Sequence, residues 1–163
     1  MKRKRSFRRA QAGFSLTELL IVVAIIGILA AVAVPRLLET LRTGRESAAI
    51  QTLRTVHNSQ AQFQATKQRF ATLKELNEAN QIDLNYANGT PVSGYIYTSS
   101  PEVTQDKYCV QATRQAATTA SRDFNVIEDG TVRFVESKSP NAIPYGEGTP
   151  LAGAGAAAGT GAK

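Results

Sequence analysis

A long apolar segment near the N-terminus, residues 14–34, constrains this chain more than any other feature of its sequence. It reads FSLTELLIVVAIIGILAAVAV, in which Glu18 is the single charged residue. A helix needs roughly 20 mostly apolar residues to cross a bilayer, so this segment is long enough to span one. The remainder of the 163 residues can form one domain of ordinary size.

The residues before this segment, 1–13, form a basic leader. The chain has 19 Lys and Arg against 13 Asp and Glu, and the whole excess comes from Lys2, Arg3, Lys4, Arg5, Arg8 and Arg9. Positive flanks stay on the cytoplasmic side of a membrane, which predicts an N-in, C-out topology. The rest of the chain is formally neutral and intersperses its cations with acids. We therefore expect no nucleic acid as principal partner.

Two kinds of processing fit this beginning. A secretory signal has the same basic and apolar regions, and Ala31-Val32-Ala33 could be its cleavage site. Glu18 favours a retained helix instead, because an acid in an apolar segment costs roughly 2.5 to 3.5 kcal/mol near the membrane centre and less near its edge. A retained helix needs a partner for that charge. Cleavage just before Phe14 creates one, since the new α-amino group is cationic near neutral pH.

A specific motif joins the leader to the apolar segment: Gly13-Phe14-Ser15-Leu16-Thr17-Glu18, followed by LLIVVAIIGILAAVAVP. It resembles the processing signal and helix start of type IV pilins and pseudopilins, closely over residues 8–36 and elsewhere only in general layout. The resemblance implies that a prepilin peptidase cuts after Gly13 on the cytoplasmic side and methylates the new N-terminal Phe14. It also implies that Glu18 pairs with the N-terminal amine of a neighbouring subunit during assembly by inner-membrane machinery.

Physical reasoning leads to the same role for Glu18. Within an apolar bundle, a neighbour's cation removes most of the cost of burying a carboxylate. Helices can slide along one another with little change in apolar contact, but only one offset brings Glu18 to an amine, so the charge selects the subunit spacing. Such a head-to-tail contact repeats without closing and builds an open helical polymer. The alternative is a carboxylate that reaches the membrane surface without a partner.

Gly27 and Pro35 interrupt the helix pattern. Proline in a helix interior removes a hydrogen bond and clashes with the preceding turn, so we expect a helix bend here. The alternative is that Pro35 ends the helix at the membrane surface. Continuation of the helix through Pro35 is favoured, because apolar residues at helical spacing resume directly after it. Their pattern predicts an amphipathic helix over residues 36–70. Its apolar positions are Leu38, Leu41, Ala48, Ala49, Leu53, Val56, Phe63 and Phe70, with Arg42, Arg45, Glu46, Arg54, Gln60 and Gln64 between them.

We expect residues 71–139 to form a globular α+β part. Thr72 and Glu75 fit a capping box for a short helix that ends near Asn80 and that Ile82 and Leu84 pack down. The content of β-branched and aromatic residues then predicts strands over 94–100, 107–113, 123–127 and 131–135.

The turn between the last two of these strands has a specific signal, because Asp129-Gly130 suits a tight hairpin. The sequence therefore predicts a long N-terminal helix, membrane-spanning over 14–35 and amphipathic beyond, packed against a small antiparallel sheet of three or four strands. We expect the core to contain Tyr95, Tyr97, Tyr108, Phe124 and Phe134.

Residues 140–163 contain few large apolar residues and many Ala and Gly, which predicts a flexible tail. Cys109 is the single cysteine, so no disulfide can form within the chain, and we expect it to fill a strand position. The single histidine, His57, is expected on the helix surface or in a hydrogen bond.

No motif in the sequence predicts catalysis, a metal site or a cofactor. A serine elbow, a zinc-ligand spacing and a P-loop are missing, and Asp123, Glu128 and Asp129 fit no established calcium-ligand pattern. The sequence instead predicts a pilin that first lies in bacterial inner-membrane lipid and then polymerises with copies of itself into an extracellular filament. The alternatives are a pseudopilin of a type II secretion system, which forms a short periplasmic structure, a DNA-uptake pilin, and an anchored domain that never polymerises.

Overall fold

The computed structural model describes residues 14–100 and 103–151, so Gly13 and the rest of the leader lie outside the described residues. The chain divides after Glu39 into two units. Its elements are α1 (Leu16–Lys67), α2 (Leu73–Glu78), α3 (Leu84–Ala87), β1 (Tyr95–Ser99), β2 (Cys109–Arg114), β3 (Arg122–Ile127), β4 (Val132–Glu136) and β5 (Thr149–Pro150).

The described part of the first unit, residues 14–39, consists of the first half of α1 and two residues before it. The helix continues through Pro35 without a break, which confirms that this proline does not end it. Every residue of this part is exposed. The predicted bend at Gly27 and Pro35 remains a prediction.

The second unit contains an antiparallel sheet in the order β1-β2-β3-β4-β5. Four strands were predicted within a few residues of their bounds, and β5 is an addition that pairs with Arg133 and Phe134 of β4. The predicted hairpin is confirmed, since Val126 of β3 pairs with Val132 of β4. Gly130 has φ +71°, and its N–H donates to the carbonyl of Ile127 at 3.0 Å, which closes the turn.

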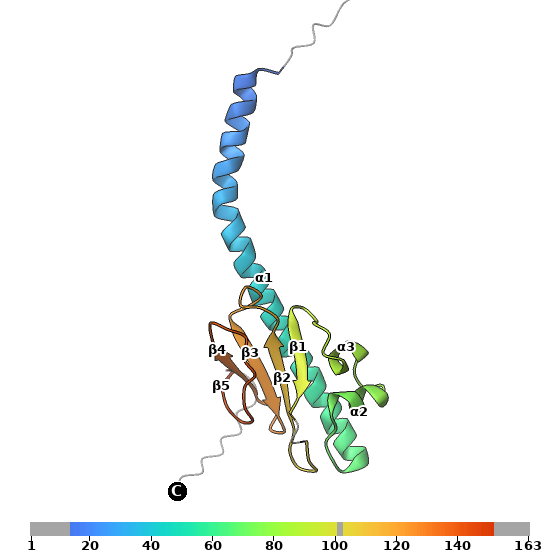
Figure 1. The fold of residues 1–163 in the computed structure, drawn as a ribbon. Coiled ribbons are helices and arrows are strands. Elements are labelled where there is room, and N and C mark those ends of the chain that lie inside the picture. Colours follow the sequence, from blue (N-terminus) through green and yellow to red (C-terminus); the bar gives the residue numbers. More distant parts are fainter. Residues whose placement is uncertain (1–13, 101–102, 152–163) are drawn as a thin grey trace, which may run out of the picture. The chain divides into compact units, whose positions relative to one another are not determined.

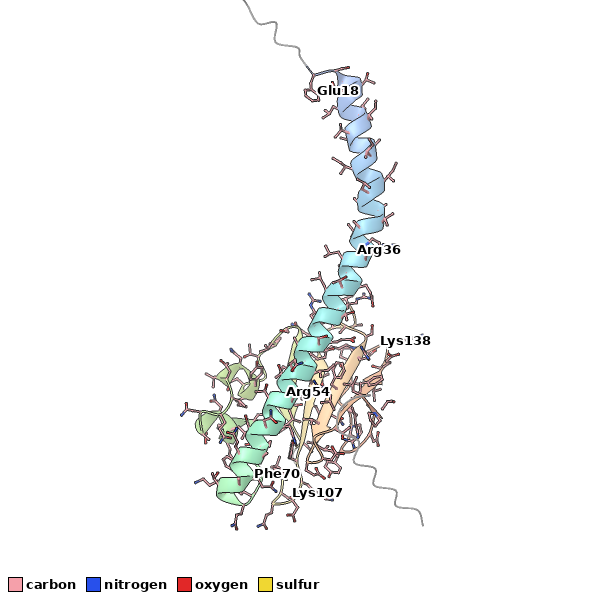
Figure 2. All side chains as sticks on the ribbon, turned by 180° about the vertical axis from the view of Figure 1, so that it is seen from behind. Glu18, Arg36, Arg54, Phe70, Lys107 and Lys138 are labelled. Carbon is pink, nitrogen blue, oxygen red and sulfur yellow. The ribbon has the colours of Figure 1, made fainter. Side chains whose placement is uncertain are left out.

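The core lies between one face of this sheet and the second half of α1, which crosses behind the strands in Figure 1. Figure 2, seen from behind, shows Arg54 on the side of the helix turned away from the sheet. Four of the five predicted aromatic residues are buried, and Phe134 is half-buried against them. The helix contributes Ala49, Leu53, Val56 and Phe63. The sheet contributes Tyr95, Tyr97, Val110, Ala112, Phe124, Val126 and Val132, and Tyr108 lies just before β2.

The predicted amphipathic stripe is confirmed at its buried apolar positions Ala49, Leu53, Val56, Phe63 and Phe70, and it is wrong at two apolar and two polar positions. Leu38 and Leu41 are exposed, because the apolar contacts of the helix with the sheet begin only at Ala49. Glu46 and Gln60, expected on the wet face, are buried. The amide of Gln60 donates to the carbonyl of Ala71 at 2.5 Å and accepts from its N–H at 2.9 Å, so it holds the turn that follows α1.

The capping box of α2 is confirmed. The hydroxyl of Thr72 accepts from the N–H of Glu75, and the carboxylate of Glu75 accepts from the N–H of Thr72 at 2.8 Å. Ile82 packs against the core as expected. The expectation for Leu84 is wrong, since it begins the unpredicted helix α3 and is 55% exposed.

Candidate functional site

The first half of α1 carries large apolar side chains on all sides. An 18-residue window of the helix has a mean hydropathy of 2.7, and none of it is buried within the structure. By length and composition α1 can therefore cross a membrane. The exposed side chains are those of Leu16, Leu19, Leu20, Ile21, Val22, Val23, Ile25, Ile26, Ile28, Leu29, Val32 and Val34, and Phe14 precedes them at 81% exposure.

Glu18 lies in the first turn of this helix, at its upper end in Figure 2. The first helical hydrogen bond joins the N–H of Leu19 to the carbonyl of Ser15 at 3.2 Å, which makes Ser15 the residue that precedes the helix. The positive end of the helix dipole favours a carboxylate in this turn. Ser15 and Glu18 also have the Ser-x-x-Glu spacing of a capping box, which the sequence interpretation missed.

At two positions of α1, the described part of the chain would leave room for a residue larger than glycine. A Cβ built on Gly27 or on Gly44 meets no atom within 4 Å. Glycine in a helix interior costs about 0.5 to 1 kcal/mol relative to alanine. The described part of the chain therefore gains no internal contact from either glycine.

The second half of α1 is joined to the sheet by a buried carboxylate, which the helical pattern had not predicted to be buried. Glu46 is 5% exposed. Its Oε1 accepts from the N–H of Ser121 at 2.9 Å, and its Oε2 accepts from Arg122 Nε at 2.8 Å. The guanidinium of Arg42 and that of Arg45 donate to carbonyls of the loop before β3, at 3.4 and 3.3 Å. These contacts hold the β2–β3 loop on the helix.

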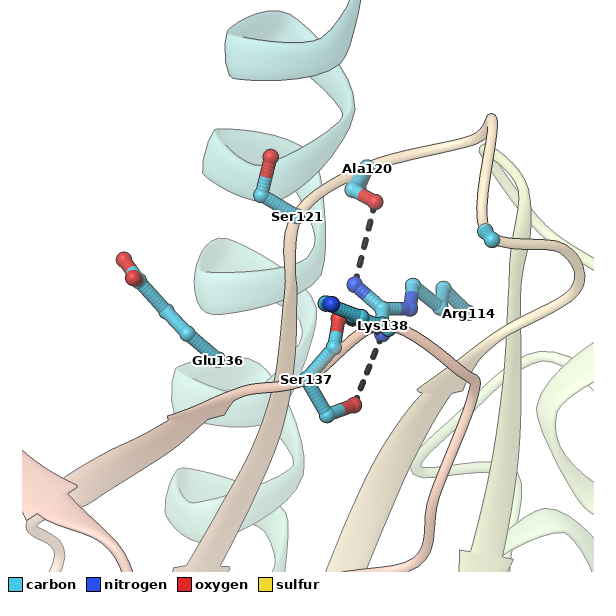
Figure 3. A pocket seen from close by; sticks show the side chains of 7 residues that line it. Arg114, Ala120, Ser121, Glu136, Ser137 and Lys138 are labelled. Carbon is cyan, nitrogen blue, oxygen red and sulfur yellow. Dashed lines mark hydrogen bonds between the residues drawn. The ribbon is translucent and has the colours of Figure 1, made fainter.

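A pocket at this end of the sheet has a buried guanidinium as its floor. Arg114 is 2% exposed and donates to the carbonyls of Ala120 at 3.1 Å and Ser137 at 2.6 Å, as Figure 3 shows. Its Nη1 and Nη2 thus donate mostly to main-chain oxygens, whereas Nε makes no hydrogen bond among the described residues. Glu136 and Lys138 on the rim are exposed to solvent. The residues that line the pocket bring no nucleophile together with a base, so its geometry does not suggest catalysis.

His57 of α1 makes a hydrogen bond to Tyr108, the residue before β2. Its Nδ1 lies 2.6 Å from the hydroxyl of Tyr108, and the two rings are stacked. Burial raises the pKa of Tyr108, so its hydroxyl stays protonated over the physiological range. The expectation of a hydrogen-bonded helix histidine is therefore confirmed. Among the residues that the structure describes, no three His, Cys, Asp or Glu side chains are grouped as metal ligands.

The family whose model matches this chain is defined by a short N-terminal motif. Residues 8–34 match the prokaryotic N-terminal methylation motif, a range that includes Gly13, Phe14 and Glu18. The chain is also 40% identical over 65 residues to the type IV major pilin protein PilA of Myxococcus xanthus (strain DK1622). This match covers 40% of the present chain and 30% of the relative. The methylation motif at the start of an exposed apolar helix, together with the helix-on-sheet arrangement beyond it, makes this chain a type IV pilin-like protein.

Proposed function

We propose that this chain is the structural subunit of a type IV pilus filament and not an enzyme. The precursor lies in the inner membrane with its N-terminus in the cytoplasm, and a prepilin peptidase cuts after Gly13 and methylates Phe14. Assembly machinery in the membrane then joins the subunits through α1 into an extracellular filament. The observation that carries the proposal is the apolar first part of α1, residues 16–34, which is long enough to cross a membrane, is exposed on all sides and carries one carboxylate, Glu18, in its first turn.

The exposed helix requires an apolar environment at every stage. In the membrane, lipid supplies it, and exchange of lipid for a neighbouring helix yields little hydrophobic free energy because lipid tails are as apolar as leucine. Outside the membrane the alternative is water, where burial stabilises by about 25 cal/mol per Å² of apolar surface. Copies of α1 packed together supply that burial. A subunit that has joined the filament is therefore held there by its apolar helix.

Glu18 supplies the selectivity that apolar packing lacks. A carboxylate surrounded by apolar helices needs a cation and hydrogen-bond donors. The methylated amine of Phe14 in a second copy is such a cation, because N-methylation leaves the amine protonated near neutral pH. Only one axial offset between neighbouring helices brings the two groups together. Glu18 thus sets the rise from one subunit to the next.

Mass spectrometry of the mature protein, from cells that contain the processing enzyme, tests the proposal. We expect a chain that begins at methylated Phe14. A chain that begins at Val34 would support ordinary secretion, and an intact Met1 would support a permanent anchor, and either result contradicts the proposal. A Gly13→Leu variant is the control, because it should keep the leader while the composition of the helix is unchanged.

A further inference from the structure

The face of the sheet that is turned away from α1 is covered by the segment that follows β4, residues 137–151, which we call the strap. Cys109 pairs with Ile127 across β2 and β3, and Gln111 pairs with Asn125. These four residues share one face because side chains alternate along a strand. The intervening residues Val110, Ala112, Phe124 and Val126 belong to the core on the α1 side.

Polar side chains of β2 and β3 hold the strap by its main chain. Gln111 Nε2 donates to the carbonyl of Ile143 at 2.8 Å. Asn125, which is fully buried, donates through Nδ2 to the carbonyls of Pro144 at 3.1 Å and Glu147 at 3.3 Å. The strap therefore follows the middle of the sheet along a row of amide side chains.

A buried ion pair fixes the start of the strap. Arg114 and Asp123 have side chains that are each 1% exposed, and Arg114 Nε lies 3.7 Å from Asp123 Oδ2. Arg114 Nη2 donates to the carbonyls of Ser137 and Ser139, at 2.6 and 2.8 Å. Asp123 Oδ2 accepts from the N–H of Asn141 at 3.1 Å. Both members of the pair thus direct their polar atoms at the strap.

Apolar burial contributes little to this attachment. Within the strap only Ile143 is buried, while Leu151 and the ring of Tyr145 are half-buried and most other residues are exposed. Segments with few buried apolar contacts open at a lower free energy than the core of the same protein. The strap has few buried apolar contacts, whereas the α1–sheet core has many, so we expect the strap to open at a lower free energy.

Cys109 lies beneath the strap. Its side chain is fully buried, yet it does not belong to the core cluster between α1 and the sheet. It shares its face with Gln111, which binds the strap. Tyr145 of the strap contacts residues beside both strands, because its hydroxyl donates to Glu128 and Lys107 lies over its ring. Burial raises the pKa of the Cys109 thiol to about 11, so the closed state holds a protonated, unreactive thiol.

We propose that the strap detaches from the sheet as a local unit while the α1–sheet core stays folded, and that this opening exposes the Cys109 thiol. The polar contacts of Gln111, Asn125 and the Arg114–Asp123 pair set how often it opens. The opening makes Cys109 reactive in a subunit that is otherwise native. This inference is independent of the proposed function.

Maleimide labelling of the full chain in detergent micelles, followed by intact mass, measures the opening directly, because Cys109 is the single cysteine. We expect slow labelling of the unmodified protein, with a rate that hardly changes at low urea concentrations. Gln111→Ala and Asn125→Ala should each accelerate labelling by roughly tenfold, since each removes a hydrogen bond that only the closed strap makes.

The matched control is Asn77→Ala, which removes an amide that donates to the carbonyl of Ile82 at 3.0 Å, away from the strap. It should leave the labelling rate unchanged. The proposal is wrong if the labelling rate rises with urea from the lowest concentration onward and does so as steeply as global unfolding. It is also wrong if the control accelerates labelling as much as the strap variants do. If Asn125→Ala does not fold, Gln111→Ala decides the question together with Tyr145→Phe, which removes the hydrogen bond from the Tyr145 hydroxyl to Glu128 and should also accelerate labelling.

Discussion

Glu46 of α1 and Arg122 at the start of β3 form an ion pair that joins two parts of the chain 76 residues apart. The carboxylate Oε2 accepts from Nε at 2.8 Å and from Nη2 at 2.5 Å. The guanidinium also lies over the rings of Phe124 and Phe134, 5.9 and 5.1 Å from their centroids. This pair therefore fixes where the helix begins to pack on the sheet.

Glu46→Gln should lower the free energy of unfolding of the second unit by about 1.5 to 3 kcal/mol, the range for hydrogen bonds to charged groups. Glutamine has one acceptor oxygen in place of two, and its NH₂ group would face the donors of Ser121 or Arg122. Urea denaturation of the full chain in mild detergent, followed by tyrosine fluorescence, measures the loss. Glu78→Gln, an exposed carboxylate on α2, is the control and should change stability by less than about 0.5 kcal/mol. Equal effects from the two variants would contradict the assigned role.

Gly130 and Gly146 have nearly the same backbone conformation, with φ of +71° and +73°. A Cβ on Gly130 would lie 2.7 Å from Nε2 of His57, whereas a Cβ on Gly146 meets no atom within 4 Å. Alanine at either position adopts the left-handed conformation at a cost of about 1 to 2 kcal/mol. Gly130→Ala should therefore destabilise the protein more than Gly146→Ala does. Thermal unfolding of both variants measures the difference, and identical losses would show that the turn does not contact His57.

The capping box of α2 predicts an acid-dependent loss of stability. The hydrogen bond from Arg69, followed by that from the N–H of Thr72, lowers the pKa of Glu75 from 4.5 to about 2. The folded state thus binds fewer protons than the unfolded state, and the contribution of Glu75 is complete above pH 4.5 and lost as the pH falls toward 2. Because the carboxylate is 34% exposed, solvent screening makes this contribution smaller than the full shift implies.

Urea midpoints measured between pH 2.5 and 6 test this dependence. Glu75→Gln keeps a hydrogen-bonding side chain but cannot titrate, so its stability should decrease less over this range than that of the unmodified protein. Parallel curves for the two proteins would assign the acid sensitivity to other carboxylates.

The regular elements could be predicted because their signals are local. Alternating β-branched and aromatic residues locate β1 to β4, and Asp129-Gly130 locates the hairpin between the last two. Thr72 and Glu75 locate the start of α2. Two-residue β5 and four-residue α3 are too short to produce a periodic pattern, and their positions depend on tertiary contacts.

The buried polar residues could not be predicted in the same way. Asp123 and Asn125 alternate with apolar residues along β3, a pattern that indicates one wet face, yet the strap covers that face and buries both. Glu46 and Gln60 have polar side chains at helical spacing, which indicates solvent, yet their partners lie elsewhere in the chain.

The central claim is that the charge of Glu18 aligns neighbouring subunits, and the yield of surface filaments from a Glu18→Gln variant tests it most directly. Glutamine can still occupy the third position of a capping box, so this variant removes the charge while it keeps the start of α1. We predict normal amounts of cleaved protein in the membrane and a filament yield lower by at least roughly tenfold, equivalent to about 1.4 kcal/mol per contact. An unchanged filament yield, with Glu78→Gln as the reference, would contradict the account.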